Sequence, residues 1–534
     1  MNKVIFTNRI LALIIIGSSL GYCFFVYSTQ LFYIDDKFFS VLGDDAMISM
    51  RYAKNWADGI GIFWNPNGSV EGYTNFLLVC VMAFIHLFNP DVSTASLYVI
   101  FFNWIMHILS VYFTYAVGLR FFKDQKSALA SAFFMAFSLQ FLLWGSHGFE
   151  TTLLTFFSIT SIYYLLKRKV IIASLIMGMG VLTRDDFTIF VFVFGSLFPF
   201  MQESDFRKKI ILSLKISSIP LIFFCLHIAW RYYYYGDFLP NTYYLKATGI
   251  DYSAKLEAGV RYILGLMPLI LCSLWAYYRL FRKTIIRNEK AFYITFFSGI
   301  LFYSLYTISV SGDAFWGARL FAPLFPIFSI AGAFLLIKNN NTNYMIFLIL
   351  VIFLLYPLNK GLLRAGFSIL KQARTSHYSS QGDQAKMPAN VRNVLSCKMI
   401  ENHALEHNIY NPSMAVYYAG IPPYMCSDFI AIDLLGKSDA YIAHTQAHYG
   451  KVGHNKYDYD YSLGEYKPTY ILSLMPSIDS LTDDNYINRP LGDFNWQFLL
   501  NSEQFIVNYS KNYLRPEVNP IFIRDPGTKK YEPK

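Results

Sequence analysis

Charged residues are scarce in this chain. Only 15% of its 534 residues are Asp, Glu, Lys or Arg, whereas 54% are hydrophobic and 19% are aromatic. A water-soluble globule of this size needs a larger charged surface, so the composition predicts a polytopic membrane protein. The net charge of +10 comes from short basic clusters between apolar runs. That distribution is typical of membrane topology, and we assign no nucleic-acid role.

Cysteine is also scarce, and its spacing excludes the common metal sites. The six cysteines show no CxxC pattern and no Cys/His ligand spacing. Four of them lie in or beside apolar runs, where they serve as small hydrophobic residues: Cys23, Cys80, Cys225 and Cys272. Cys397 and Cys426 lie in the polar C-terminal part. Because isolated pairs tend to be bridged in an oxidising compartment, we expect a disulfide between them.

Long apolar runs are abundant, and a helix needs about 20 apolar residues to cross a bilayer. We expect about eleven transmembrane helices, over residues 10–34, 96–119, 127–145, 149–166, 170–183, 186–200, 209–234, 259–281, 291–311, 320–337 and 343–357. The first run lacks a small-residue cleavage site and is predicted to stay attached as a signal anchor. The run over 76–88 is too short to cross, so it predicts a juxtamembrane or re-entrant helix.

Lys and Arg concentrate in alternate connections, which the positive-inside rule places in the cytoplasm. The clusters are Lys3/Arg9, Arg120/Lys123/Lys126, Lys167/Arg168/Lys169, Arg207/Lys208/Lys209, Arg279/Arg282/Lys283/Arg287/Lys290 and Lys338. The N-terminus is therefore predicted to be cytoplasmic, and the intervening connections are predicted to face the outer side of the membrane.

Apolar runs stop near residue 357. We expect a membrane domain over 1–357 and a soluble mixed α/β domain over 358–534 on the outer side. Strands are expected within 414–419 and 470–474, and helix in parts of 386–408.

Unusual polar residues fall in the predicted outer connections. Asp44 and Asp45 directly follow the first apolar run, and later connections carry Glu150, Arg184 and Lys246. Ionisable groups at helix ends are costly to desolvate, which makes them functional hypotheses. A carboxylate can take a proton from an acceptor hydroxyl, and a cation can neutralise a departing phosphate. The pattern suits sugar transfer from a phosphate-linked lipid.

Simpler explanations exist for several of these residues. Glu150 can complement a helix dipole, and Arg184 with Asp185 can form a local ion pair. His147 is more typical of a hydrogen-bonded loop than of a metal ligand, because no second ligand lies at the required spacing. A transporter can also place charges in a cavity, usually nearer the bilayer midplane.

Several motifs together resemble the GT-C membrane glycosyltransferases, in particular the terminal arabinofuranosyltransferases of actinobacterial cell walls and their Gram-negative relatives. The motifs that carry the resemblance are Asp44-Asp45-Ala-Met-Ile-Ser-Met-Arg51-Tyr52, Glu71-Gly72-Tyr73-Thr74-Asn75, Trp144-x-x-His147-Gly148-Phe149-Glu150-Thr151, Thr183-Arg184-Asp185-Asp186, Pro240-Asn241-Thr242-Tyr243-Tyr244-x-Lys246 and Asp433-x-x-Gly436-x-x-Asp439 with Ile442-Ala443-His444. Their order covers residues 43 to about 445. His147, Asp185 and Phe76 depart from the family pattern and leave the sugar open.

The resemblance implies a GT-C fold in a bacterial cytoplasmic membrane, with the soluble domain in the periplasm. It implies a polyprenyl-phosphate-sugar donor and a glycan or glycolipid acceptor. It assigns the catalytic base to Asp44, with Asp45 supporting it or binding the acceptor. Implied donor and substrate contacts are Arg51, Glu71, Tyr73, Asn75, Glu150, Arg184, Asp185, Asn241, Tyr243, Lys246, Asp313 and Arg319; implied acceptor contacts are Asp433, Asp439 and His444.

The implied chemistry requires no cofactor, although a carboxylate pair can hold a divalent cation. Three functions remain open at this level: a glycosyltransferase, a transporter or flippase for a lipid-linked sugar, and a non-catalytic glycan-binding scaffold. The sugar can be a pentofuranose such as arabinofuranose, a hexose or an amino sugar. The acceptor can be lipopolysaccharide, a wall polymer or a protein.

Overall fold

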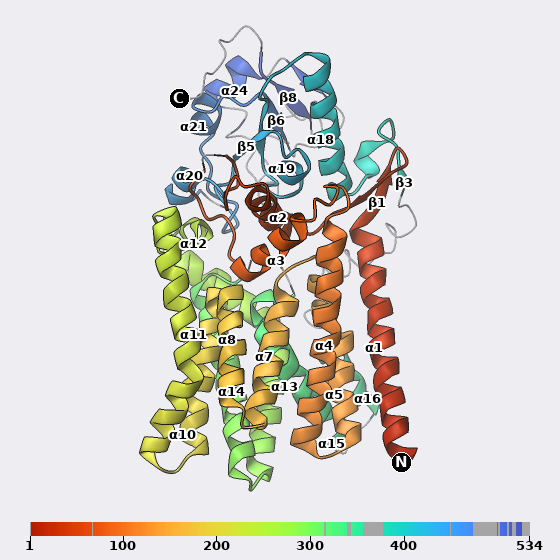
Figure 1. Ribbon diagram of the computed structural model, residues 1–534, viewed down its shortest axis with the longest axis vertical. Helices are drawn as coiled ribbons and strands as arrows, with labels where there is room; N and C mark the ends of the chain where they lie inside the picture. Colours follow the sequence, from red (N-terminus) through yellow and green to blue (C-terminus); the bar gives the residue numbers. More distant parts are fainter. Residues whose placement is uncertain are drawn as a thin grey trace.

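The computed structural model describes residues 2–66, 68–313, 315, 317–338, 343–355, 377–448, 450–473, 499, 502–509, 512–514 and 520–525. Figure 1 shows a bundle of long helices with a C-terminal region of short helices and strands above one end. Helices α2 (Asp44–Ala57) and α3 (Phe76–His86) lie between these two parts. The domain boundary expected at 357/358 falls outside the described residues.

The first apolar run forms a helix that ends earlier than predicted. Helix α1 spans Asn2–Thr29, and the end of the run forms strand β1 (Leu31–Ile34) instead. Strand β1 pairs antiparallel with β2 (Lys37–Ser40). Asp35 and Asp36 make the two-residue turn at φ 47° and 64°, the left-handed conformation that such hairpins need. The hairpin leads the chain directly to the acidic start of α2.

The bundle contains helices of very different lengths. Its α-helices are α4 (Ser96–Phe122), α5 (Gln125–Phe137), α6 (Leu139–Ser146), α7 (Thr151–Leu166), α8 (Val170–Thr183), α9 (Thr188–Phe192), α10 (Phe198–Gln202), α11 (Phe206–Tyr235), α13 (Tyr252–Lys283), α14 (Arg287–Ser309), α15 (Phe325–Lys338) and α16 (Asn343–Leu350), with α12 (Asn241–Ala247) joining α11 to α13. Short 3₁₀ turns cover Asp185–Phe187 (η1) and Arg319–Leu324 (η3), and π-helical turns cover Val193–Leu197 (η2) and Val351–Leu355 (η4).

Every run predicted to cross the membrane holds helical residues, but fewer helices have the length to span it. In the described part of the chain, six are long and apolar enough, or seven if α5 and α6, bent by 46°, form one span. Helices α3, α7 and α8 are apolar but shorter. The structure therefore establishes six or seven candidate spans, and the count of eleven stays a prediction. The 11-residue α3 agrees with the short helix expected over 76–88.

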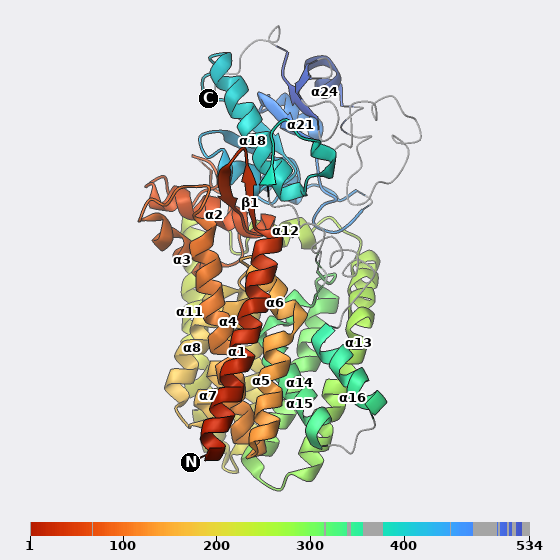
Figure 2. The same cartoon turned by 90° about the vertical axis from the view of Figure 1, so that its right-hand side faces the viewer.

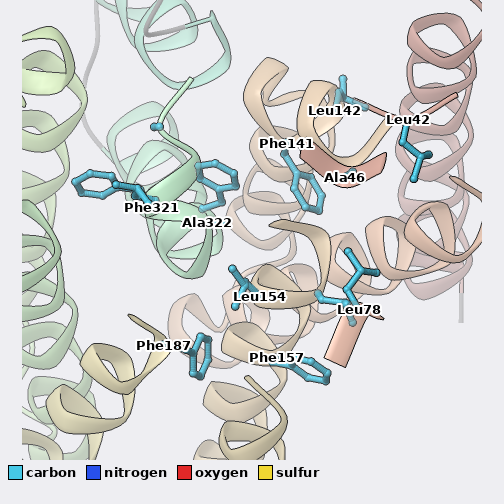
Figure 3. Close-up of a cluster of buried hydrophobic side chains, with 14 of the residues drawn as sticks. Leu42, Ala46, Leu78, Phe141, Leu142, Leu154, Phe157, Phe187, Phe321 and Ala322 are labelled. Atoms are coloured by element: carbon cyan, nitrogen blue, oxygen red, sulfur yellow. The ribbon is translucent and has the colours of Figure 1, made fainter. Parts of the chain in front are cut away.

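One continuous hydrophobic core joins the bundle to the C-terminal region. Figure 3 shows part of it, where Ala46 of α2 and Leu78 of α3 lie near Phe141 of α6 and Leu154 of α7. All four side chains are at most 2% exposed. Burial of this apolar surface holds α2 firmly on the end of the bundle.

The C-terminal region is mixed α/β, as predicted. Its five-stranded sheet has the order β5-β4-β6-β8-β7, formed by β4 (Ser413–Val416), β5 (Ile430–Asp433), β6 (Tyr470–Leu472), β7 (Tyr513–Leu514) and β8 (Ile521–Ile523). Strand β4 is parallel to β5 and β6, whereas β8 is antiparallel to both of its neighbours. A separate small strand, β3 (His377–Tyr378), pairs with β1. The helices are α18 (Ala389–Glu406), α19 (Ile421–Met425), α20 (Ala440–His444), α21 (Tyr459–Gly464) and α24 (Glu503–Asn508).

A disulfide between Cys397 and Cys426 connects α18 to the end of α19, with Cα atoms 5.8 Å apart. The sequence-based prediction of this bridge is confirmed.

The two ends of the bundle differ in the way that the charge pattern predicts. The N-terminus and the turn from α10 to α11 lie at the lower end in Figures 1 and 2, where basic clusters were expected. Helices α2 and α12 lie at the opposite end, beside the C-terminal region. The predicted outer connections thus meet on one face, while the assignment of that face to the periplasm stays a prediction.

Candidate active site

A cavity of about 500 Å³ lies where the helix bundle meets α2, α12 and the C-terminal region. Most residues predicted for the site line it: Asp45, Tyr73, Asn75, Glu150, Arg184, Asp185, Tyr243, Lys246, Asp313 and Arg319. Segments far apart in the sequence therefore contribute to one chamber. Other predicted residues lie outside the lining: Asp44, Arg51, Glu71, Asn241, Asp433, Asp439 and His444.

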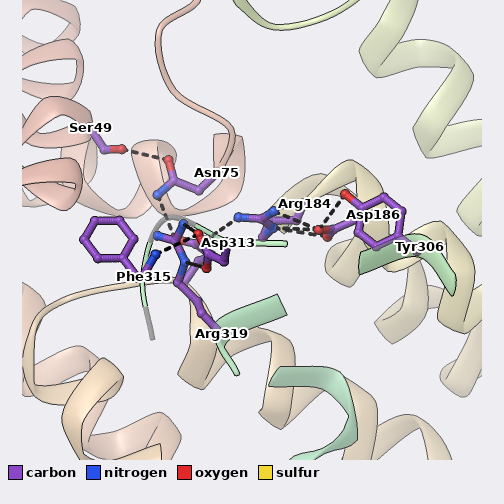
Figure 4. Close-up of polar contacts among 9 residues, drawn as sticks. Ser49, Asn75, Arg184, Asp186, Tyr306, Asp313, Phe315 and Arg319 are labelled. Carbon is purple, nitrogen blue, oxygen red and sulfur yellow. Dashed lines mark hydrogen bonds and ion pairs between the residues drawn. The ribbon is translucent and has the colours of Figure 1, made fainter. Parts of the chain in front are cut away.

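A chain of hydrogen bonds runs along the cavity wall (Figure 4). Ser49 donates to Asn75 Oδ1 at 2.8 Å, and Asn75 Nδ2 donates to Glu150 Oε2 at 3.2 Å. Arg184 then joins Glu150, at 2.9 Å, to Asp186, at 2.8 Å. Because Arg184 binds both carboxylates and Asn75 connects Glu150 to α2, these hydrogen bonds hold the wall in one arrangement.

Asp313 and Arg319 form a second buried ion pair beside the same cavity (Figure 4). The guanidinium donates to both carboxylate oxygens, at 3.0 and 3.1 Å. It also lies 5.1 Å from the ring of Phe149 and 4.8 Å from that of Phe315. This bidentate, ring-flanked arrangement fixes Arg319 at the edge of the chamber.

Asp45 receives its cation from the C-terminal region. Lys437 Nζ lies 2.5 Å from Asp45 Oδ1. Burial favours a raised pKa, but the positive charges of Lys437, Arg319 and Lys246 outweigh it and hold the pKa of Asp45 well below its usual range. Asp45 is therefore a carboxylate at neutral pH.

A tight turn positions Lys437, and two predicted substrate residues build that turn. The Asp433 carboxylate accepts hydrogen bonds from the N–H groups of Leu435, at 3.0 Å, and Ser438, at 2.7 Å. The Asn241 amide donates to the Lys437 carbonyl at 3.0 Å. These contacts give Asp433 and Asn241 a supporting role, and their direct contacts with a substrate stay predictions.

Asp44 faces away from the chamber although it is adjacent to Asp45. Its Oδ1 accepts a hydrogen bond from the Ile421 N–H at 2.8 Å, and burial raises its pKa to about 6. A Cβ at position 420 would collide with the Asp44 backbone carbonyl, so glycine is needed for this close approach. The structure thus places Asp44 in the joint between α2 and α19.

Arg51 also joins the two parts of the molecule. It is 1% exposed and donates to the carbonyls of Trp64, at 2.5 Å, and Phe429, at 2.9 Å, as well as to that of Pro423. These bonds use the Arg51 guanidinium to connect α2 to the C-terminal region, and its contact with a substrate stays a prediction.

Glu71 is paired with Arg231 behind the cavity wall. Arg231 Nε lies 2.5 Å from Glu71 Oε2, and both side chains are 2% exposed. Arg231 also reaches Asp185 at 3.0 Å. Next to Glu71, the Tyr73 hydroxyl lies 3.1 Å from that of Tyr235. The pair anchors the 71–75 segment to α11, and a role of Glu71 in substrate binding stays a prediction.

The last two predicted acceptor residues shape the surface around α20. Asp439 caps this helix by accepting from the Ile442 N–H at 2.9 Å. His444 is exposed, and its ring lies 4.4 Å from that of Tyr244.

Lys246 stands apart from the other cations in the chamber. It lines the cavity, and no ion pair joins it to any described residue. Burial lowers its pKa, and the carboxylates of Asp313 and Asp45 act in the opposite direction. A half-buried ammonium that no described residue pairs with is suited to an anionic ligand.

Sequence reasoning missed four residues of the site: Ser49, Asp186, Tyr306 and Lys437. The first two belong to quoted motifs but were given no role, and Tyr306, whose hydroxyl donates to Asp186 at 3.3 Å, lies in an apolar run without any signal. Lys437 lies in the quoted Asp433–Asp439 motif, yet nothing local indicates that it pairs with Asp45.

Among the described residues of the chamber, no group of three potential metal ligands lies close enough together to bind a divalent cation. The one group of three potential ligands found within the described ranges is Cys397, Glu401 and Cys426, which lies outside the chamber and whose cysteines form the disulfide. We therefore derive no step through a metal.

No family model matches this chain, and no curated protein matches it by sequence. Among solved structures, the apo oligosaccharyltransferase of Archaeoglobus fulgidus is similar, with TM-score 0.51 and 11% identity over 88% of this chain and 70% of that chain. The archaeal oligosaccharyltransferase AglB from the same organism, in complex with an inhibitory peptide and a dolichol-phosphate, gives TM-score 0.51 and 11% identity over 97% and 74%. The chain is thus a polytopic helical membrane protein with a fold like that of this archaeal oligosaccharyltransferase. The finer resemblance to arabinofuranosyltransferases stays a prediction.

Proposed function

We propose that this protein is a membrane glycosyltransferase that moves a sugar from a polyprenyl-phosphate donor to a glycan or glycolipid. The observation that carries the proposal is the presence of the Asp45 carboxylate and the unpaired Lys246 ammonium in one chamber. The similar archaeal enzyme was solved with a dolichol-phosphate, which supports a lipid-phosphate donor.

The proposed reaction needs one base and one cation. Asp45 accepts the proton of an acceptor hydroxyl, whose oxygen bonds to the anomeric carbon of the donor sugar. The bond between that carbon and the phosphate oxygen breaks, and the electron pair leaves with the lipid phosphate. Lys246 neutralises the charge that develops on this phosphate, and Arg319 contributes at longer range.

The proposal assigns the base to Asp45 in place of Asp44. Adjacent residues on a helix point about 100° apart, and it is Asp45 that lines the chamber. Asp44 then serves as the hydrogen-bonded link to α19. Geometry decides here, because a base must reach its proton before its pKa matters.

The proposed setting is a bacterial cytoplasmic membrane, with the bundle (1–357) spanning it and the C-terminal region (358–534) in the periplasm. Cysteines placed at Lys123 and at Lys451 test the orientation with a membrane-impermeant thiol reagent in intact cells. Labelling at position 451 alone agrees with the proposal, and labelling at position 123 contradicts it.

The activity is tested with full-length protein in liposomes and a set of polyprenyl-phosphate sugars that includes arabinofuranose. Transfer of label from one donor to an envelope glycan, lost in Asp45→Asn, is the expected result. Movement of the intact donor across the bilayer without transfer would instead identify a flippase.

A further inference from the structure

A second cavity, of about 720 Å³, adjoins the chamber on the side of α13 and the C-terminal region. It lies between the start of α13, the turn after α14 and the loop over 446–455. The two cavities share four lining residues, Lys246, Val310, Gly312 and Asp313. A ligand in the second cavity is therefore next to the chamber that holds Asp45.

Specific contacts hold this second cavity in shape. Lys456 is fully buried, and its ammonium donates to the carbonyls of Tyr244, at 3.1 Å, and Ala443, at 2.6 Å. The Ala447 N–H donates to the Gly249 carbonyl at 2.9 Å. Gly249 has a φ of +61°, and a Cβ there would meet the Thr445 carbonyl at 2.7 Å. The 446–455 loop is thus fastened to the connection between α12 and α13.

Two polar groups on the wall of this cavity have no hydrogen-bond partner. Asn455 is 4% exposed, and its Nδ2 donates to the His448 carbonyl at 3.0 Å, which leaves its Oδ1 as an unsatisfied acceptor. The Ser311 hydroxyl is likewise unpartnered. A buried acceptor without a donor costs on the order of 1–3 kcal/mol, so the site is suited to a ligand that donates hydrogen bonds.

The unsatisfied Asn455 acceptor distinguishes between phosphate and sugar ligands. Phosphate oxygens are acceptors and would repel the Asn455 carbonyl oxygen, whereas a sugar hydroxyl donates to it and also pairs with Ser311. Of the cations in the lining, Arg261 is paired with Glu257 at 2.5 Å, and Lys246 lies on the wall shared with the chamber. Asp313, on the shared wall, adds a further acceptor for hydroxyl groups.

We propose that this second cavity, formed by α13, the 310–313 turn and the 446–455 loop, binds the sugar rings of the acceptor glycan and presents a hydroxyl to the chamber. The inference rests on the proposed function, since it locates the acceptor of that same reaction. Asn455 and Ser311 line this cavity and not the chamber, whereas Lys246 lies on the wall that the two share.

Two variants test the subsite in the full-length protein. Ser311→Ala removes one unpartnered hydroxyl, and Ala258→Trp fills the cavity from α13. Leu271→Trp is the matched control, because Leu271 is an exposed residue of the same helix outside the cavity lining. The probe is the oligosaccharide fraction released from the envelope of the organism that makes the protein, and free polyprenyl phosphate probes the donor side.

Ser311→Ala is expected to weaken oligosaccharide binding roughly fivefold, the value of one net hydrogen bond, and Ala258→Trp is expected to abolish it. Neither variant is expected to change polyprenyl-phosphate binding, and Leu271→Trp is expected to change neither. Oligosaccharide that fails to bind the wild type, or binds Ala258→Trp as well as the wild type, would overturn the inference. If the wild type does not bind polyprenyl phosphate, the proposed function itself would be overturned.

Discussion

Lys437 of the C-terminal region forms a 2.5 Å ion pair with Asp45 of α2, although 392 residues separate them in the sequence. The pair joins the two parts of the molecule at the wall of the chamber. It also keeps the proposed base ionised, because a nearby ammonium favours the charged form of a carboxyl group. The C-terminal region is thus part of the proposed active site as well as its cover.

Removal of this ammonium should alter the pH dependence of the reaction. In the wild type the lowered pKa of Asp45 places the acidic limb of the rate profile far below neutrality. Lys437→Met should move that limb upward, since an unpaired buried carboxyl group binds its proton more tightly. Turnover measured from about pH 4 to pH 8 checks this. If the acidic limb lies at the same pH in Lys437→Met and the wild type, a group other than Asp45 determines its position.

The two adjacent aspartates should respond differently to the same substitution. Asp45→Asn should lower turnover by at least about 100-fold, the low end of general-base contributions, with donor binding retained. Asp44→Asn keeps size and hydrogen-bonding capacity at a position outside the chamber and should preserve most activity. Transfer assays and donor-binding measurements on both variants decide. The reverse ranking would return the base to Asp44, as the motif resemblance implied.

The pH dependence of the protein's stability should reflect the burial of Asp44. Its pKa is raised to about 6 in the folded protein. Its contribution to stability is therefore complete below its unfolded pKa and is lost as pH rises through about 6. A shift of this size corresponds to about 3 kcal/mol.

The melting temperature of the wild type should thus fall between about pH 4 and pH 6.5, and that of Asp44→Asn should fall less, because Asn mimics the protonated form. Thermal melts in detergent measure the difference. Parallel pH profiles for the two proteins would contradict the buried, proton-binding state of Asp44.

Lys246→Gln should weaken polyprenyl-phosphate binding by roughly 10- to 100-fold, the range expected for a charge-assisted hydrogen bond. Lys167→Gln, directly after α7 and outside the chamber lining, is the control and should bind normally. Titration of the lipid phosphate into each purified variant supplies the measurement. Equal affinity in Lys246→Gln and the wild type would remove Lys246 from the donor site.

The disulfide should be present in the isolated protein and should contribute to its stability. Six cysteines minus the bridged pair leave four free thiols in the unreduced, denatured chain. With a sequence separation of 29, the bridge should contribute about 3 to 4 kcal/mol. Cys397→Ser with Cys426→Ser should therefore melt earlier, whereas Cys225→Ser, an exposed cysteine, should not. A count of six thiols would refute the bridge.

The sequence by itself determined that the chain is a polytopic membrane protein, that its long apolar runs hold helices, and on which face its polar residues gather. These features follow from local composition, because about 20 apolar residues define a span and basic clusters define its ends. The pairing of Cys397 with Cys426 was also accessible, since the C-terminal part contains no other cysteine.

Only the tertiary structure decided which residues share the chamber. Asp44 and Asp45 are equivalent in the sequence, but the helical rotation of about 100° between them sends one to α19 and the other to the cavity. The roles of Lys437 and Asn455 were equally hidden, because their surroundings come from segments hundreds of residues away. The local sequence gives the residue type and its place on a helix, whereas contacts between distant segments decide which side chains surround it.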